Sequence, residues 1–251
     1  MEIIGLDAGH DLIDPGAISP IRPEIGDLLH TKEAAITLAI TRRLEGILIA
    51  CGYKPIMTRT TESSVSLKRR TDILNQAKCR IAISVHINSQ IGHTARYIST
   101  FIQGTGGQAE KLAKAIQPKL VRATGWPDGG VRVANLHMTR ETVMPVVLVE
   151  LGFLSNPEQE KQLNNPGLQA KLAAALAEGT IEYLGGSEPW QLALLRCAWD
   201  TEAAQAEIKR AGSVYRQKIA EAEAAHVWAN KVRQASGTRI IDAIEEGKTN
   251  G

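Results

Sequence analysis

The alternation of short apolar runs with longer segments of helical period constrains the fold of this chain more than any other feature. Five runs have the length and residue types of buried strands: residues 3–6, 53–58, 81–87, 98–103 and 146–151. Four segments have helical periodicity: residues 32–50, 67–77, 108–123 and 165–184. Apolar strands that alternate with helices indicate parallel pairing, because crossover helices cover both faces of such a sheet. The sequence therefore predicts an α/β fold with a mostly parallel sheet flanked by helices.

The composition favours a globular chain and excludes some partners. Of the 251 residues, 43% are hydrophobic, which is too many for a disordered chain. Lysine and arginine number 29 against 27 aspartates and glutamates, which leaves a net charge of +2. This balance gives no support for a nucleic-acid partner, because such proteins concentrate positive charge. Cys51, Cys79 and Cys197 are widely spaced and odd in number, so we expect free thiols rather than disulfides.

A glycine-rich break at residues 185–189 divides the chain into two predicted parts. We expect a catalytic domain at residues 1–184 and a helical C-terminal appendage at residues 188–251. A heptad-like spacing from Trp190 to Tyr215 favours homo-oligomerisation or targeting through this helix. The alternative is that the helix folds back on the catalytic domain.

The apolar segments also bear on localisation. No stretch approaches the ~18 apolar residues of a membrane span, so we expect no transmembrane segment. The N-terminus lacks the basic start and the longer apolar run of a signal peptide. The sequence thus predicts a protein that is synthesised and held in the cytoplasm.

Two histidines and two glutamates stand where a ligand site is expected. His10 follows the first strand, and His86 closes the third. Glu150 interrupts an apolar run, and Glu33 opens a helix. The carboxyl ends of strands in an open α/β sheet form its ligand site, so these side chains could converge. Two histidines and one glutamate are a common ligand set of catalytic zinc, which leaves the other glutamate as a base. Taken singly, each residue also fits a surface or satisfied core position.

Four ordered blocks of sequence carry a resemblance to a known family. They are residues 7–10 with 14–17, residues 32–33, residues 65–70 with 84–89, and residues 145–157. The first resembles the motif DPGHGGxDPGA, and the last, PVVLVELGFLSNP, is similar to PavLvElGFlSNp. Together they resemble the zinc-dependent N-acetylmuramoyl-L-alanine amidases of the α/β sandwich type, over roughly residues 1–184. The departures are Ala8 in place of proline and Asp11-Leu12 in place of a glycine pair.

The resemblance implies an activity, a cofactor and a set of site residues. These enzymes cleave the amide between the lactyl group of N-acetylmuramic acid and L-alanine in peptidoglycan. His10, Glu33 and His86 match the zinc ligands, and Glu150 matches the catalytic glutamate. Because the spacing from His10 to Glu33 is long, Glu24 is a rival ligand, although it lacks a matching helix start.

Three further residues are candidates for substrate contacts. Asn88 follows His86 and could orient substrate at the rim of the site. Arg140 precedes the Glu150 strand and could bind a carboxylate of the stem peptide, with a structural ion pair as the alternative. His30 could contact substrate or be a solvated loop residue.

The resemblance and the missing signal peptide favour a bacteriophage endolysin, or one derived from a prophage, that acts on the cell wall after release. One alternative is a non-catalytic module that binds peptidoglycan or regulates its hydrolysis. Such a module is expected to have lost a ligand or the glutamate, and all four residues are present here. The other alternative is a zinc hydrolase that acts on a different amide.

Overall fold

The computed structural model describes residues 2–20 and 30–186, which form an α/β fold around one sheet. The strands are β1 (Ile3–Ala8), β2 (Lys54–Met57), β3 (Ile81–Asn88), β4 (Ile98–Ile102), β5 (Asp128–Val133) and β6 (Val146–Phe153). The helices are α1 (Glu33–Ala50), α2 (Leu67–Gln76), α3 (Gln108–Thr124), α4 (His137–Glu141), α5 (Pro157–Leu163) and α6 (Pro166–Tyr183). The predicted fold class is confirmed. The appendage expected at residues 188–251 and the rival ligand Glu24 lie outside the described residues.

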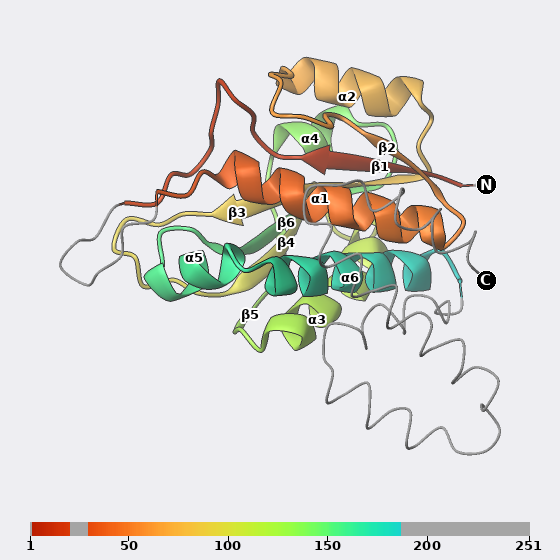
Figure 1. The fold of residues 1–251 in the computed structure, drawn as a ribbon. Coiled ribbons are helices and arrows are strands. Elements are labelled where there is room, and N and C mark those ends of the chain that lie inside the picture. Colours follow the sequence, from red (N-terminus) through yellow and green to blue (C-terminus); the bar gives the residue numbers. More distant parts are fainter. Residues whose placement is uncertain (1, 21–29, 187–251) are drawn as a thin grey trace, which may run out of the picture.

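The six strands lie in the order β2-β1-β3-β6-β4-β5 (Figure 1). The pairs β1–β2, β1–β3 and β3–β6 are parallel, whereas β4 runs antiparallel to β6 and carries β5 parallel to itself. The carboxyl ends of β1, β3 and β6 therefore meet the beginning of β4 at one edge of the sheet. Ligand sites of open α/β sheets form at this edge.

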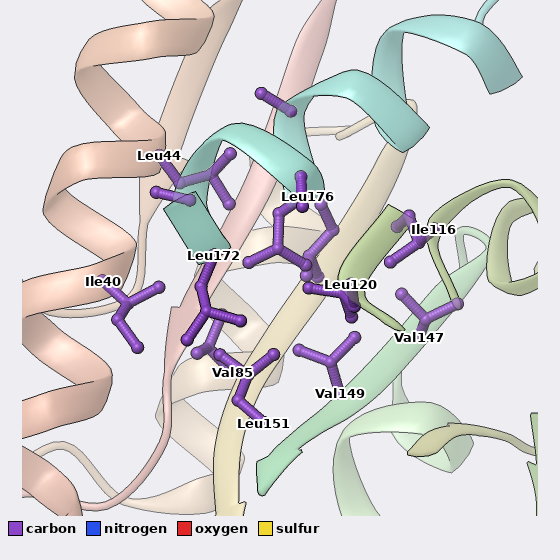
Figure 2. Packing of buried hydrophobic residues seen from close by; sticks show 14 of the residues in the cluster. Ile40, Leu44, Val85, Ile116, Leu120, Val147, Val149, Leu151, Leu172 and Leu176 are labelled. Atoms are coloured by element: carbon purple, nitrogen blue, oxygen red, sulfur yellow. The ribbon is translucent and has the colours of Figure 1, made fainter. Parts of the chain in front are cut away.

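One face of the sheet carries the main hydrophobic core. Helices α1, α6 and α3 pack against this face, with α6 in contact with the other two (Figure 1). Figure 2 shows side chains from all three helices converging on strand residues such as Val85, Val149 and Leu151. These strand residues are fully buried. The core is mainly aliphatic.

The opposite face is apolar at one end and polar at the other. Leu74 of α2 and Met138 of α4 cover Ala82 and Val146, near the beginnings of β3 and β6. Toward the carboxyl ends of the strands, this face carries a row of polar residues: Asp7, Ser84, His86 and Glu150. Side chains alternate between the two faces of a strand, so these polar residues point away from the aliphatic core.

The beginning of α1 is fixed by backbone bonds to the loop that follows β1. Ile18 and Lys32 form an antiparallel bridge, and Glu33 N donates to the carbonyl of Ala17. No side chain caps this helix terminus, so the bridge defines where α1 starts. Glu33 is consequently the first residue of a helix that begins beside the polar end of the sheet.

The structure adds β5, α4 and α5 to the predicted elements. β5 has the sequence DGGVRV, whose two glycines interrupt any apolar pattern. α4 and α5 are only five and seven residues long, too short to show a helical period. Among the helices of residues 30–186, none has the length and apolar character needed to cross a bilayer.

Candidate metal centre

Three side chains from separate elements converge at the polar edge of the sheet. His10 lies just beyond β1, Glu33 begins α1 and His86 is in β3. Each offers one ligand atom, and these atoms lie within 4.8 Å of one another. The structure thus brings together the three residues for which the sequence predicts ligand roles.

The Glu33 carboxylate lies between the two imidazoles. Its Oε1 is 3.0 Å from Nδ1 of His86, and its Oε2 is 3.3 Å from Nε2 of His10. The backbone N–H groups of Ala17 and Ile87 donate to the same carboxylate, each at 2.9 Å. Burial raises the pKa of Glu33, but the hydrogen bond and charge of His86 outweigh it and hold this pKa below its ordinary value. Glu33 therefore presents an ionised carboxylate to the site.

His10 is held in one ring orientation. Its Nδ1 is 3.0 Å from Oδ2 of Asp14, which leaves Nε2 on the side of Glu33. Its ring meets the ring of His86 edge to face, with centroids 4.9 Å apart. A carboxylate on the far nitrogen of a histidine orients the ring and raises its basicity as a ligand.

Glycines make room for the two histidine rings. A Cβ added at Gly9 would overlap the ring of His86. Gly16 has φ +68°, a conformation that favours glycine, and a Cβ there would meet both Glu33 and the His10 ring. The glycines of the first sequence block are thus required by the packing of the cluster.

Glu150 lies beside the cluster in the sheet. It is the register partner of His86 in the parallel pair β3–β6. Its Oε2 is buried and has no hydrogen-bond partner among the described residues. Burial raises the pKa of Glu150 to about 8, with a smaller raising effect from Glu33 and an opposing one from His86. Among His10, Glu33, His86 and Glu150, only Glu150 has a buried side-chain oxygen without a hydrogen-bond partner in the described residues.

Two arginines brace the backbone around His10. Arg59 donates to the carbonyls of Ala8, Gly9 and Ala34, and so joins the end of β1 and the loop that bears His10 to α1. Arg70 donates to the carbonyls of Ala8 and His10. A role for Arg59 was missed in the sequence, because its position after the β2 strand matches no motif considered there.

Arg70 also forms a buried ion pair beneath the cluster. Its Nη1 is 3.0 Å from Oδ1 of Asp7, and both side chains are almost fully buried. The hydroxyls of Ser84 and Thr58 donate to the same Asp7 carboxylate at 2.6 Å each. Arg70 stands in the third sequence block, and this network explains why an arginine belongs there.

A cavity of about 280 Å³ opens beside His10, on the α2 side of the cluster. Its lining includes Asp14, Ile13 and Leu67 as well as His10 and His86. Ile13 and Leu67 are exposed apolar side chains. The cluster therefore faces a space that a ligand can enter.

The structure gives the remaining candidates other contacts. The Asn88 side chain accepts from the N–H of Ser89 and shapes its own loop. Arg140 binds Glu141 at 2.7 Å and Asn135 at 3.0 Å, as the ion-pair alternative expects. Nδ1 of His30 lies 3.1 Å from the carbonyl of Ser19, away from the three-residue cluster.

Comparison with known families decides the identity of this arrangement. A family model described as N-acetylmuramoyl-L-alanine amidase matches residues 4–182. The chain belongs to this amidase family. The match runs from the second residue of β1 to the last but one residue of α6, and it includes His10, Glu33, His86 and Glu150.

The relatives of this chain include a bacterial protein and a phage protein. The chain is 31% identical over 184 residues to the N-acetylmuramoyl-L-alanine amidase LytC of Bacillus subtilis, and the match covers 72% of this chain but only 35% of LytC. It is 32% identical over 200 residues to the endolysin of Bacillus phage SPP1, covering 75% of this chain and 70% of the endolysin.

A solved structure shares the fold of the amidase. The catalytic domain of CwlV, an N-acetylmuramoyl-L-alanine amidase from Bacillus (Paenibacillus) polymyxa var. colistinus, is similar with a TM-score of 0.68 and 30% identity. The similarity covers 74% of this chain and all of that domain. The described residues therefore share their fold with the whole of that domain.

Proposed function

We propose that the protein is a zinc-dependent peptidoglycan hydrolase that cleaves the amide between N-acetylmuramic acid and L-alanine of the stem peptide. The observation that carries the proposal is the His10, Glu33 and His86 cluster with the unpartnered Glu150 beside it. Family membership and the amidase relatives support the substrate class.

The donor set fits zinc. Two imidazole nitrogens and one carboxylate are a ligand set of catalytic zinc sites, which keep a fourth position for water or substrate. Glu33 is ionised and central, and the Asp14 contact orients His10, so His10, Glu33 and His86 would hold the ion. When bound, zinc lowers the pKa of a water molecule toward ~7 and polarises the carbonyl of the scissile amide.

Glu150 supplies the proton transfers in the proposed mechanism. Its free Oε2 faces the same side of the sheet as His86, so it can accept the proton of the attacking water. The leaving group is the nitrogen of L-alanine, which must gain a proton as the amide breaks. Glu150 can pass its newly acquired proton to that nitrogen, and the carboxylate is then restored.

The test is digestion of purified peptidoglycan by the full-length, zinc-loaded protein. We expect a new amino terminus on L-alanine and free lactyl carboxylates on N-acetylmuramic acid, with no new reducing sugar ends. Binding to sacculi without any new amino terminus would support the non-catalytic module instead. New amino termini on another residue, with none on L-alanine, would support the hydrolase of a different amide.

We further propose that the protein works as an endolysin, held inside the host and acting on the wall after release. The similarity to the SPP1 endolysin over 70% of that protein supports this setting. Expression in a host cell should be harmless until the membrane is permeabilised, and lysis should then follow. Lysis during expression in cells with intact membranes would contradict it.

We also propose that residues 1–184 are the catalytic unit and that residues 188–251 serve targeting or self-association. The family match ends at residue 182, which supports this division.

A further inference from the structure

Two buried polar groups face each other across β4 and β6 without hydrogen-bond partners. Ser99 of β4 and Glu150 of β6 are register partners in the antiparallel pair of these strands. The Oγ of Ser99 and the Oε2 of Glu150 are both buried, and neither has a partner within the described residues. Only one further buried side-chain atom there shares this property, Nε2 of His137 on α4. Buried polar groups are nearly always paired, so this coincidence requires a reason.

The two side chains lie on the same face of the sheet. Figure 2 shows Val149 and Leu151 in the aliphatic core, so the intervening Glu150 points to the other face. The neighbour of Ser99, Thr100, bonds Gln117 of α3 and thus faces the core side. Ser99 therefore points to the side on which Glu150 and the metal cluster lie. Directly opposite residues of an antiparallel pair have Cβ atoms ~4.5–5.5 Å apart. This separation allows a serine hydroxyl on one strand to form a hydrogen bond with a glutamate carboxylate on the other.

The two groups are also chemically complementary. A serine hydroxyl has a proton to donate, and a carboxyl oxygen of glutamate can accept it. The nearby Ser84 hydroxyl on this face is already committed to Asp7. Ser99 is fully buried and therefore cannot contact the substrate itself.

We propose that Ser99 is a positioning residue for Glu150, whose carboxylate accepts a hydrogen bond from the Ser99 hydroxyl in the working enzyme. This inference rests on the proposed amidase function and on the role of Glu150 in it. A rotation about side-chain torsions brings the groups together, and catalytic hydrogen bonds often tighten only when substrate is bound. The bond holds the carboxylate in one orientation between His86 on one neighbouring strand and Ser99 on the other.

The experiment compares Ser99→Ala with Thr100→Val in the full-length, zinc-loaded protein. Both substitutions remove a buried hydroxyl from β4, but only Thr100 has a partner in the structure. On a soluble muropeptide, we expect Ser99→Ala to lower kcat about 10- to 100-fold, as for a lost hydrogen bond to a charged group, with KM little changed. Urea unfolding and zinc content of Ser99→Ala should match those of the wild type. We expect Thr100→Val to show the reverse, with lower stability and a wild-type kcat.

Ser99→Thr keeps the hydroxyl and should restore most of kcat. The inference is overturned if Ser99→Ala has a wild-type kcat, or if its loss of kcat is matched by Thr100→Val. The inference is also overturned if the whole loss of kcat/KM in Ser99→Ala comes from a higher KM. Each of these outcomes is compared with a wild-type protein that is active on the same substrate. A wild-type protein that releases no L-alanine amino terminus would instead overturn the proposed function.

Discussion

Glu150 and His86 occupy paired positions on two parallel strands, with their side chains on the same face of the sheet. His86 is bound to Glu33, whereas Oε2 of Glu150 is buried without a partner among the described residues. The spacing between the cluster of His10, Glu33 and His86 and the proposed base Glu150 is therefore set by the backbone hydrogen bonds between β3 and β6. A base placed in this way can lie near the ligands without being one of them.

The first prediction concerns this division of roles. Glu150→Gln should retain the fold and one zinc ion per chain, but lose ~10²–10⁴-fold in kcat, because the amide cannot accept the proton. Muropeptide turnover and metal analysis of the same sample check both parts. Turnover close to that of the wild type would assign the base to another residue, and loss of zinc would make Glu150 a ligand.

The second prediction concerns the ligands. His86→Ala should lose most of its bound zinc, since it removes one of three donors and leaves the Glu33 carboxylate less well oriented. Metal analysis after dialysis against a weak chelator measures the loss. His93→Ala, which changes an exposed loop residue, is the control and should bind zinc as the wild type does. Full zinc occupancy in His86→Ala would contradict the ligand assignment.

The third prediction uses the close approach of Gly9 to the metal cluster. Gly9→Ala should lower zinc affinity ~10- to 100-fold, because the new Cβ must displace the His86 ring from its orientation. The overpacking should also lower the free energy of unfolding by about 1–3 kcal/mol. Gly104→Ala is the matched control, since a Cβ at Gly104 meets nothing within 4 Å. Equal zinc affinities for the two variants would show that the ring tolerates the added methyl group.

The fourth prediction concerns pH and the buried pair of Asp7 and Arg70. Burial raises the pKa of Asp7, but Arg70 and the hydroxyls of Ser84 and Thr58 outweigh it, so this pKa lies below its ordinary value. A carboxyl whose pKa is lowered on folding stabilises the protein fully above its unfolded pKa of ~3.9. That contribution is lost as the pH falls through the folded pKa.

Asp7→Asn should therefore lower the free energy of unfolding of the zinc-free protein by about 1.5–3 kcal/mol at pH 7, because Arg70 loses its charged hydrogen bond to Asp7 and keeps only the buried Asp11 as a charge partner. The difference from the wild type should shrink as the pH falls from ~4 toward the lowered pKa of folded Asp7, because the unfolded chain takes up this proton first. Urea unfolding between pH 7 and pH 3 measures this. The ion pair of Lys68 and Asp72 on the surface is the comparison. Asp72→Asn should lower the free energy of unfolding by only ~0.3–0.5 kcal/mol. A difference for Asp7→Asn that stays constant with pH would argue against an ionised Asp7.

The fifth prediction concerns the division of the chain. A protein without residues 188–251 should retain wild-type kcat on a soluble muropeptide, because the family match and the metal cluster lie before this segment. Light scattering of the full-length and shortened proteins tests self-association, which should be lost on deletion. If both proteins are monomers, the proposed role in self-association is wrong.

The fold class and the site residues could be predicted because both leave local marks in the sequence. The apolar runs at residues 81–83 and 146–149 are continuous, since both faces of β3 and β6 are covered where these strands begin. The four blocks also fix the spacing of His10, Glu33, His86 and Glu150, and the structure brings the first three together. Their roles as ligands and base stay predictions.

Other features could not be predicted, because they depend on contacts between segments distant in the sequence. Arg59 acts through three carbonyls on two other elements, which no local pattern reveals. Ser99 gains its significance only from the antiparallel register with Glu150, 51 positions later in the chain. The five-residue helix α4 is too short for a helical pattern to stand out, and the two glycines of β5 break any alternation of apolar residues.

The bonds of Arg59 have a consequence for how the metal enters and leaves. By joining the carbonyls of Ala8 and Gly9 to that of Ala34, Arg59 connects the segment that bears His10 to the helix turn that bears Glu33. These bonds do not involve the ligand atoms, so we expect them to hold the two segments together whether or not the ion is bound. Little ordering of the chain then accompanies metal uptake, which removes a large part of the entropy that binding to an unformed site would cost. Chelation should accordingly be reversed by adding zinc at the speed of ligand exchange, without any refolding step.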